Sequence, residues 1–365
     1  MDAMPPARTW DSRAYLRRSV PLLLRSKEAV RLLPVETLER SALRHKVARR
    51  APALLPIPAR DDRESFHRVR PSERFLRPAL KADRTASQLA EQVRNLSCTL
   101  HCRICERLTI LAAACPRCRG PLDAAYDWDA ITVSRNSIGA GPDSLWRYGS
   151  LLPISEREPH AGWTPIVEAP VLAAQLGLSE LWLKLETAHI PQQDARMRAV
   201  ATAAAKTFGL DVGNDWLRLA PYAAEGPKTV AFEIVEQLGW RFPCAVIAPV
   251  ATGRLLIKLG QGFDELERVG LLGGSRPRLL GALPTGTAFR GMDGELAEAT
   301  AAAVNGKIVD VPPPGGVRAL LQIVSDEARA GAFASSHVVV LVVAGDGPAT
   351  AREVELLLNL IDLEL

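Results

Sequence analysis

Residues 244–269 read CAVIAPVATGRLLIKLGQGFDELERV, and this stretch predicts a buried strand followed by a helix. Cys244–Val250 is short and apolar throughout, which is typical of a strand covered on both faces. Gly253 separates this strand from a helix predicted over Leu255–Val269. A buried strand that leads directly into a helix is the repeating unit of a parallel α/β fold.

The same alternation recurs in the rest of the C-terminal two thirds of the chain. Further strands are predicted at residues 181–184, 278–283, 307–311 and 338–344. Further helices are predicted at residues 197–207, 228–238, 317–330 and 349–361. Apolar strands separated by helices predict an α/β fold with a parallel sheet covered by helices on both faces.

The composition is that of an ordinary globular protein. The 365 residues are 47% hydrophobic and 24% charged. The longest apolar run, Val338–Ala344, is far shorter than the roughly 20 residues that cross a bilayer. Arg and Asp interrupt the first twenty residues, so no secretory signal is expected. We therefore expect a cytoplasmic protein without a membrane span.

Charge is distributed unevenly, and this marks a separate N-terminal arm over residues 1–95. The arm holds 21 Lys and Arg against 11 Asp and Glu, a net charge of +10, and the remaining 24 basic and 30 acidic residues give −6. Nine prolines leave room only for short helices in the arm. A basic arm on an acidic body binds nucleic acid or an acidic partner, or it is simply a solvated extension.

Five of the six cysteines lie close together, in a segment predicted as a ribbon over residues 96–130. Two CxxC pairs, nine residues apart, are formed by Cys102, Cys105, Cys115 and Cys118. Four thiolates satisfy tetrahedral Zn²⁺ with no open position, so the spacing predicts a structural zinc site. Disulfides are the alternative, and they fit poorly with a chain that shows no export signal.

Three other residues are relevant to the metal site or to thiol chemistry. Cys98 and His101 are close enough in sequence to replace one of the four cysteines as ligands. Cys244 lies in an apolar strand and is predicted to be a buried core thiol.

Several segments over residues 98–365 follow the order used by one enzyme family. The cysteine segment is followed by Ser144-Leu-Trp-Arg-Tyr148, Gly162-Trp-Thr-Pro165 and Leu181-Trp-Leu-Lys184-x-Glu186. The chain therefore resembles the threonine synthase family of pyridoxal-phosphate enzymes of fold type II. The resemblance implies an α/β domain over residues 131–365, pyridoxal phosphate as cofactor, and conversion of O-phosphohomoserine to threonine.

The first departure from this family concerns its Schiff-base lysine. The family places that lysine between Gly-Ser-Phe and Asp-Arg-Gly, where this chain has Gln192-Gln-Asp-Ala-Arg196. Asp194 or Ala195 therefore falls at the lysine position, and neither side chain can form an imine. The nearest lysines, Lys184 and Lys206, are predicted to belong to a strand core and to a helix.

The other expected cofactor contacts are also depleted. A phosphate group needs backbone N–H groups that a glycine-rich turn presents, and here Gly253 is followed directly by the bulky Arg254, predicted to be a solvated surface residue. Ala344 falls where the family has the Thr or Ser that faces the pyridine nitrogen. The residues that remain as a degenerate cofactor site are Thr252, Gly253, Gly345 and Gly347.

The largest departure is an internal deletion near residues 208–224. The resemblance places most of a small domain between the helix at 197–207 and Glu225, and that domain forms one wall of the cleft. Only Phe208–Ala224 spans this gap here.

Three functions follow from this combination of resemblance and loss. The first is a catalytically silent pseudoenzyme that serves as a zinc-containing binding or regulatory module, with a protein partner or a second copy of itself. The second is an active pyridoxal-phosphate-dependent lyase that makes threonine or acts on a related amino acid. The third is a nucleic-acid-binding protein that uses the basic arm and the zinc ribbon.

Overall fold

The computed structural model describes residues 98–156, 160–186, 192–287, 289, 292–313, 315–333 and 337–344. Contacts divide the chain into two units, Met1–Arg70 and Pro71–Leu365, and the described residues all belong to the second. The basic arm and the closing helix predicted at 349–361 lie outside the described residues. Within the described ranges, no helix combines the length and the apolar character that a membrane span requires.

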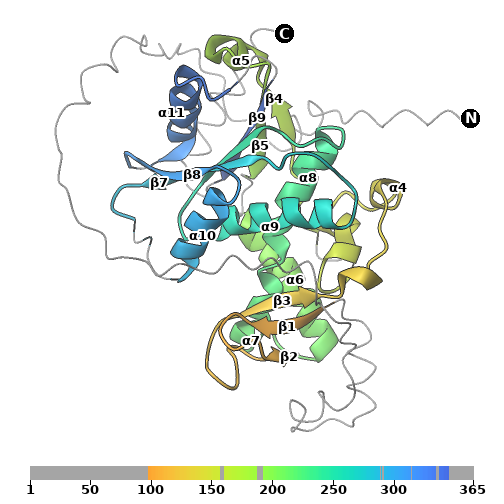
Figure 1. Cartoon of the computed structure of the whole chain (residues 1–365). Coiled ribbons are helices and arrows are strands. Elements are labelled where there is room, and N and C mark those ends of the chain that lie inside the picture. The colour runs from red at the N-terminus through yellow and green to blue at the C-terminus, as the bar shows by residue number, and fades with distance from the viewer. Residues whose placement is uncertain are drawn as a thin grey trace, which may run out of the picture. The chain divides into compact units, whose positions relative to one another are not determined.

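A six-stranded, mainly parallel sheet forms the centre of the fold (Figure 1), as predicted. Its strand order is β4-β5-β9-β6-β7-β8, and only the β4–β5 pair is antiparallel. The strands are β4 (Ile166–Glu168), β5 (Glu180–Glu186), β6 (Ala245–Pro249), β7 (Arg278–Pro284), β8 (Lys307–Val311) and β9 (Val338–Ala344). β9 is buried over nearly its whole length, which is why its sequence is apolar without alternation.

Helices cover both faces of this sheet. Figure 1 shows α5 and α11 on one face and α8, α9 and α10 on the other. The helices are α4 (Arg135–Gly139), α5 (Pro170–Leu176), α6 (Gln192–Phe208), α7 (Trp216–Ala223), α8 (Thr229–Gln237), α9 (Arg254–Arg268), α10 (Met292–Ala302) and α11 (Gly316–Arg329). The helices bury the apolar faces of the sheet. Removal of this apolar surface from water is the main driving force for the arrangement.

A second, smaller sheet carries the cysteines. Its three antiparallel strands run in the order β2-β1-β3, with β1 at Cys98–Cys102, β2 at Leu108–Thr109 and β3 at Leu122–Tyr126. The ribbon shares a hydrophobic core with α6 and α7, to which Leu100 and Tyr222 contribute. Because its apolar side chains pack against these helices, the ribbon is part of the folded body.

Most predicted elements agree with the structure within two residues at each end, apart from an earlier start of α6 and a longer β5. Outside the ribbon, five of the described α-helices and strands were missed, namely α4, α5, β4, α7 and α10, and the first two have only five and seven residues. β4 has only three residues, too few to show a period. α7 contains Pro221, which argues against a helix by propensity. α10 includes Gly294 and a run of alanines rather than a clear apolar stripe.

Four fully buried charged side chains meet where β5, α6 and α8 pack together, and we call them the Arg196 cluster. They are Lys184, Glu186, Arg196 and Glu233. Arg196 Nη2 lies 2.8 Å from Glu186 Oε1, and Arg196 Nη1 contacts Glu233 Oε1. Lys184 Nζ lies 2.7 Å from Glu233 Oε2. Two cations and two anions make the cluster neutral, which is the condition under which charges are tolerated in a core.

The loop that leads into β4 is joined to the same cluster. The backbone N–H groups of Trp163 and Thr164 donate to the Glu233 carboxylate at 2.8 and 3.0 Å. Gly162 has a φ of 77°, and a Cβ there would lie 2.6 Å from Arg196 Nη1. The glycine of the Gly-Trp-Thr-Pro segment is therefore required by the close approach of Arg196.

A second buried cluster links the ribbon to α9, and we call it the Lys228 cluster. Lys228 Nζ lies 2.8 Å from both Glu225 Oε2 and Glu265 Oε2. Lys258 Nζ lies 2.5 Å from Glu225 Oε1, and the hydroxyl of Tyr126 on β3 donates to Glu225 at 2.9 Å. The ribbon strand β3 is thus fixed to the α/β body by a charge-assisted hydrogen bond.

Replacing Glu233 should destabilise the fold strongly. In Glu233→Gln, Lys184 and Arg196 stay buried with one carboxylate fewer, and we expect a loss of about 3–5 kcal/mol in the free energy of unfolding. Glu156→Gln is the matched control, because Glu156 pairs with the exposed Lys206, and we expect a loss of about 1 kcal/mol or less. Urea unfolding measures both. Equal losses in the two variants would contradict a structural role for the Arg196 cluster.

The stabilisation by Glu233 should disappear at low pH. Burial alone would raise the pKa of Glu233, but Arg196 and Lys184 outweigh it and lower the pKa to about 2. A folded-state pKa below the unfolded value of about 4.3 gives stability that is complete above that value and lost as pH falls towards 2. The difference in unfolding free energy between wild type and Glu233→Gln should therefore be constant near neutrality and shrink below about pH 5. A difference independent of pH down to 2 would contradict this pKa.

Candidate functional site

The four cysteines of the two CxxC pairs converge on one point of the ribbon. The Sγ atoms of Cys102, Cys105, Cys115 and Cys118 all lie within 4.8 Å of one another. The shortest separations are 3.5 Å, between Cys102 and Cys118 and between Cys105 and Cys115. A disulfide requires about 2.05 Å, so the thiols are not bonded to each other. Four convergent thiols match the ligand set of a closed tetrahedral metal site.

Each CxxC pair forms a tight turn that directs backbone N–H groups at sulfur. The N–H of Ile104 donates to Cys102 Sγ and that of Arg117 donates to Cys115 Sγ, both at 3.4 Å. The backbone N–H of Cys105 lowers the pKa of the Cys102 thiol below its usual value. These contacts favour the thiolate form, which is the form that binds metal.

The alternative ligands considered from the sequence do not join this quartet. Cys98 lies at the start of β1 and is buried, and burial raises its pKa well above the usual range of a thiol. Along β1 the burial alternates, so His101 lies on the opposite face from Cys102. Only the four CxxC cysteines therefore belong to the candidate metal site within the described residues.

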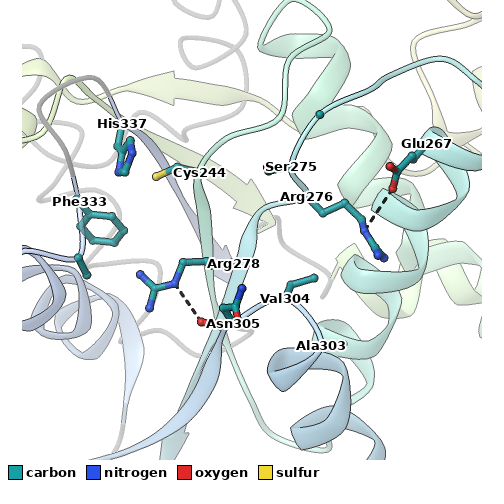
Figure 2. Close-up of a pocket in the computed structure, with 12 residues that line it drawn as sticks. Cys244, Glu267, Ser275, Arg276, Arg278, Ala303, Val304, Asn305, Phe333 and His337 are labelled. Atoms are coloured by element: carbon teal, nitrogen blue, oxygen red, sulfur yellow. Dashed lines mark hydrogen bonds and ion pairs between the residues drawn. The ribbon is translucent and has the colours of Figure 1, made fainter. Parts of the chain in front are cut away.

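The prediction for Cys244 was partly wrong. It is half-buried rather than enclosed in the core, because it precedes β6 at the amino edge of the sheet. There it lines a pocket of about 500 Å³ (Figure 2). Arg276 and Arg278 also line this pocket, but Arg276 pairs with Glu267, and Arg278 pairs with Glu327 and donates to the Asn305 carbonyl. Both arginines of this pocket are thus already paired with carboxylates.

The residues expected around a cofactor lie at the opposite, carboxyl edge of the sheet. β9 lies between β5 and β6, so the carboxyl ends of these three parallel strands are adjacent. Asp194 and Ala195 lie in the first turn of α6, which follows β5. Ala344 ends β9 and is paired in register with Glu186. Ligands of open α/β sheets bind at such an edge.

The segment that the resemblance implies for phosphate binding, Thr252 and Gly253, is also at this edge, and α10 packs against it. Gly253 is the residue before α9 and has a φ of 83°. A Cβ there would lie 2.9 Å from both Ala297 Cβ and the Asp293 carbonyl oxygen, which belong to α10. Thr252 is exposed, and the exposed Arg254 lies 3.4 Å from the Asp293 carboxylate. Gly345 and Gly347 lie outside the described residues.

All five lysines that follow residue 98 pair with a carboxylate. Lys206 and Lys307 are exposed and lie 2.7 Å from Glu156 and Glu327. The three buried lysines, Lys184, Lys228 and Lys258, belong to the Arg196 and Lys228 clusters.

Lys184 is the buried lysine on the strand that leads to the expected cofactor position. Its Nζ donates to the Thr164 carbonyl oxygen at 2.6 Å, to Glu233 at 2.7 Å and to Gln237 at 2.9 Å. Burial lowers its pKa, and the Glu233 carboxylate opposes this shift. An ammonium has three hydrogens, so these three acceptors satisfy it completely. Lys184 lies in the core of a strand, as predicted, and there it neutralises the charge of Glu233.

Two curated threonine synthases are similar to this chain. The protein of Methanosarcina acetivorans is 24% identical over 247 residues, covering 47% of this chain and 60% of the relative. That of Methanocaldococcus jannaschii is 25% identical over 256 residues, covering 47% and 63%. No protein-family model matches the chain. The chain is threonine synthase-like. It spans less than two thirds of the length of these relatives.

Similar solved structures include threonine deaminases. The crystal structure of the T.th. threonine deaminase is 18% identical and covers 50% of this chain and 92% of that chain, with a TM-score of 0.34. The processed form of threonine deaminase isoform 2 from Solanum lycopersicum is 13% identical and covers 54% and 83%, with a TM-score of 0.36.

The described residues of this threonine synthase-like chain fit a metal better than they fit pyridoxal phosphate. The cysteine quartet supplies a complete ligand set for zinc. At the carboxyl edge, by contrast, the described lysines are paired, α10 packs against Gly253, and Ala344 has no polar side-chain atom. The side chains described at that edge therefore offer no group suited to hold this cofactor.

Zinc binding should depend on the quartet alone. We expect about one zinc per chain in the purified protein, and Cys115→Ser should abolish it and lower the melting temperature, because structural zinc contributes on the order of 10 kcal/mol to small domains. Cys244→Ser is the matched control and should retain the metal, because Cys244 lies outside the quartet. Elemental analysis and thermal unfolding measure both effects. Full zinc content in Cys115→Ser would rule out this site.

Proposed function

We propose that this threonine synthase-like chain is a catalytically silent pseudoenzyme that acts as a zinc-containing binding or regulatory module. One observation carries the proposal: each lysine after residue 98 is engaged by a carboxylate. The resemblance, in addition, implies that Asp194 or Ala195 occupies the Schiff-base position. Catalysis by the family's cofactor begins with a lysine amine that is available to its aldehyde. The buried ammonium groups of Lys184, Lys228 and Lys258 are held by carboxylates and do not offer that amine, whereas Lys206 and Lys307 are exposed surface residues.

The Arg196 cluster adds a second argument, because it lies beside the expected lysine position. Arg196 follows Asp194 and Ala195 on α6, and its guanidinium is fully buried between Glu186 and Glu233. Both carboxylates are therefore already committed to cations. The cluster stabilises the junction of β5, α6 and α8, and none of its four charges is left unpaired to bind an amino-acid substrate.

The anion-binding end of α9 supports the same view. A phosphate at a helix N-terminus needs open backbone N–H groups and a positive potential. Here α10 lies 2.9 Å from the Cβ position of Gly253, and the Asp293 carboxylate faces Arg254. The carboxylate would repel a phosphate dianion and also competes for the arginine.

The lengths of the matched segments support the internal deletion. The alignment with the first relative is 247 positions long, but the residues of this chain in it amount to only 47% of the chain. An alignment of 247 positions without gaps would cover about 68% of the 365 residues. The relative therefore has many positions without a counterpart here. Between α6 and Glu225 the structure has only the eight-residue α7, which packs against the ribbon. A substrate would lack the cleft wall that the resemblance implies.

The module that remains would consist of the α/β body with a zinc-stabilised ribbon fixed to it. The ribbon is held by the shared core with α6 and α7 and by the hydrogen bond from Tyr126 to Glu225. Such a rigid, buried connection suits a surface that presents fixed side chains to a protein partner or to a second copy of the chain.

Purified protein with added pyridoxal phosphate should show no aldimine absorption band. Borohydride treatment should leave no pyridoxyl group at a buried lysine. Peptide mass mapping measures the second outcome, and the Methanosarcina acetivorans threonine synthase treated identically is the positive control. A Lys206→Arg/Lys307→Arg variant removes adventitious reaction at the two exposed lysines. An aldimine band that persists in this variant, with a mapped buried lysine, would show an active cofactor site and overturn the proposal.

A further inference from the structure

The turns of the cysteine ribbon present a group of exposed arginines. Arg107, Arg117 and Arg119 each lie within two residues of a cysteine of the quartet, and all three are exposed. Because the four Sγ atoms lie within 4.8 Å of one another, the turns that carry these arginines are neighbours. We call the three arginines the knuckle surface. Glu106 is the one acidic residue between Cys102 and Gly120.

Within the described part of the chain, the three arginines of the knuckle surface are close together in the ribbon and none of them pairs with a carboxylate. Arg103, on the same ribbon, forms contacts with both Asp123 and Asp293. The positive charge of the knuckle surface is therefore available to a ligand, whereas that of Arg103 is not.

The backbone under these arginines is fixed by local contacts. The N–H of Cys102 donates to the Arg107 carbonyl oxygen at 3.0 Å, and the N–H of Arg119 donates to the Cys115 carbonyl oxygen at 2.9 Å. Ile104 packs over the second turn, since a Cβ on Gly120 would lie 2.9 Å from its Cδ1. A rigid platform reduces the entropy lost when the side chains bind.

Apolar side chains adjoin the arginines. Ile104 is 60% exposed and Leu108 is 42% exposed, and both lie on the ribbon. Leu217, on the α7 helix that packs against β3, is 70% exposed. The large exposed hydrophobic residues of the described part are these three, so they concentrate on the ribbon and on the helix beside it. Ile104 and Leu108 thus expose apolar surface on the same ribbon as the three arginines.

The sequence adds further positive charge directly before the ribbon. β1 begins at Cys98, and the 95-residue arm that precedes it carries a net charge of +10. Three unpaired arginines on the ribbon and a basic sequence before it favour a long polyanion with evenly spaced charges over a short acidic segment.

We propose that the knuckle surface binds nucleic acid through its phosphate backbone. The planar guanidinium of arginine can donate to two phosphate oxygens at once. Three such groups on two rigid turns would hold the nucleic-acid strand in place. The ribbon offers no exposed aromatic platform within the described residues, so base stacking contributes little and binding is insensitive to sequence. This proposal is independent of catalytic silence, because it concerns a different surface and a different measurement.

The test is the salt dependence of binding to a fluorescent single-stranded or duplex oligonucleotide, measured by anisotropy with the full zinc-containing chain. Loss of three phosphate contacts in Arg107→Ala/Arg117→Ala/Arg119→Ala should reduce the slope of log K against log salt by about 2 to 3. Several unrelated oligonucleotide sequences should lose affinity equally. A triple Lys variant at the same positions should retain most of the slope, because the charges remain.

The matched control is Arg198→Ala/Arg318→Ala. These arginines are exposed and have no carboxylate partner among the described residues, but they lie on α6 and α11. The control should bind as the wild type does, and zinc content and melting temperature should be unchanged in every variant compared. An unchanged slope in the triple Ala variant, or no binding by wild type, would overturn the proposal. Equal competition by polyglutamate would also overturn it, in favour of an acidic protein partner.

Discussion

The pairing of Arg196 with two buried carboxylates is the interaction on which the rest of this structure depends. Arg196 brings α6 to the carboxyl end of β5 through Glu186, and to α8 through Glu233. Each ion alone would be very costly to bury, so the four charges of the cluster must be assembled together. This requirement fixes how α6 leaves the sheet, and α6 in turn forms the apolar surface on which the ribbon packs.

The same constraint explains why a cofactor-like edge has no described side chains suited to cofactor chemistry. The carboxyl ends of β5, β9 and β6 are adjacent, as an α/β ligand site requires. The charges at that edge instead neutralise each other: Lys184 satisfies three acceptors, and Asp293 faces Arg254. On the ribbon, by contrast, Arg107, Arg117 and Arg119 are exposed and pair with no carboxylate of the described residues. The buried charges described at this edge therefore stabilise the α/β body together with its hydrophobic core.

Much of this organisation was predictable from local patterns. The buried strands were found because burial on both faces leaves a continuous apolar run, as in β9. The cysteine quartet was found because each CxxC pair fixes two ligands within one turn. The missed elements had weak local signals: β4 has three residues, and α7 contains a proline that its tertiary contacts override. Cys244 was placed too deep because an apolar neighbourhood does not reveal which end of a strand faces a pocket.

The sequence by itself determined the α/β class, the order of the major elements and the convergence of four thiols. Only the tertiary structure decided which charges neutralise each other. Glu233 is 49 residues from Lys184 and 37 from Arg196, and no periodicity in the sequence links them. Local patterns record which side chains avoid water, whereas ion pairing depends on distances that exist only after the chain has folded.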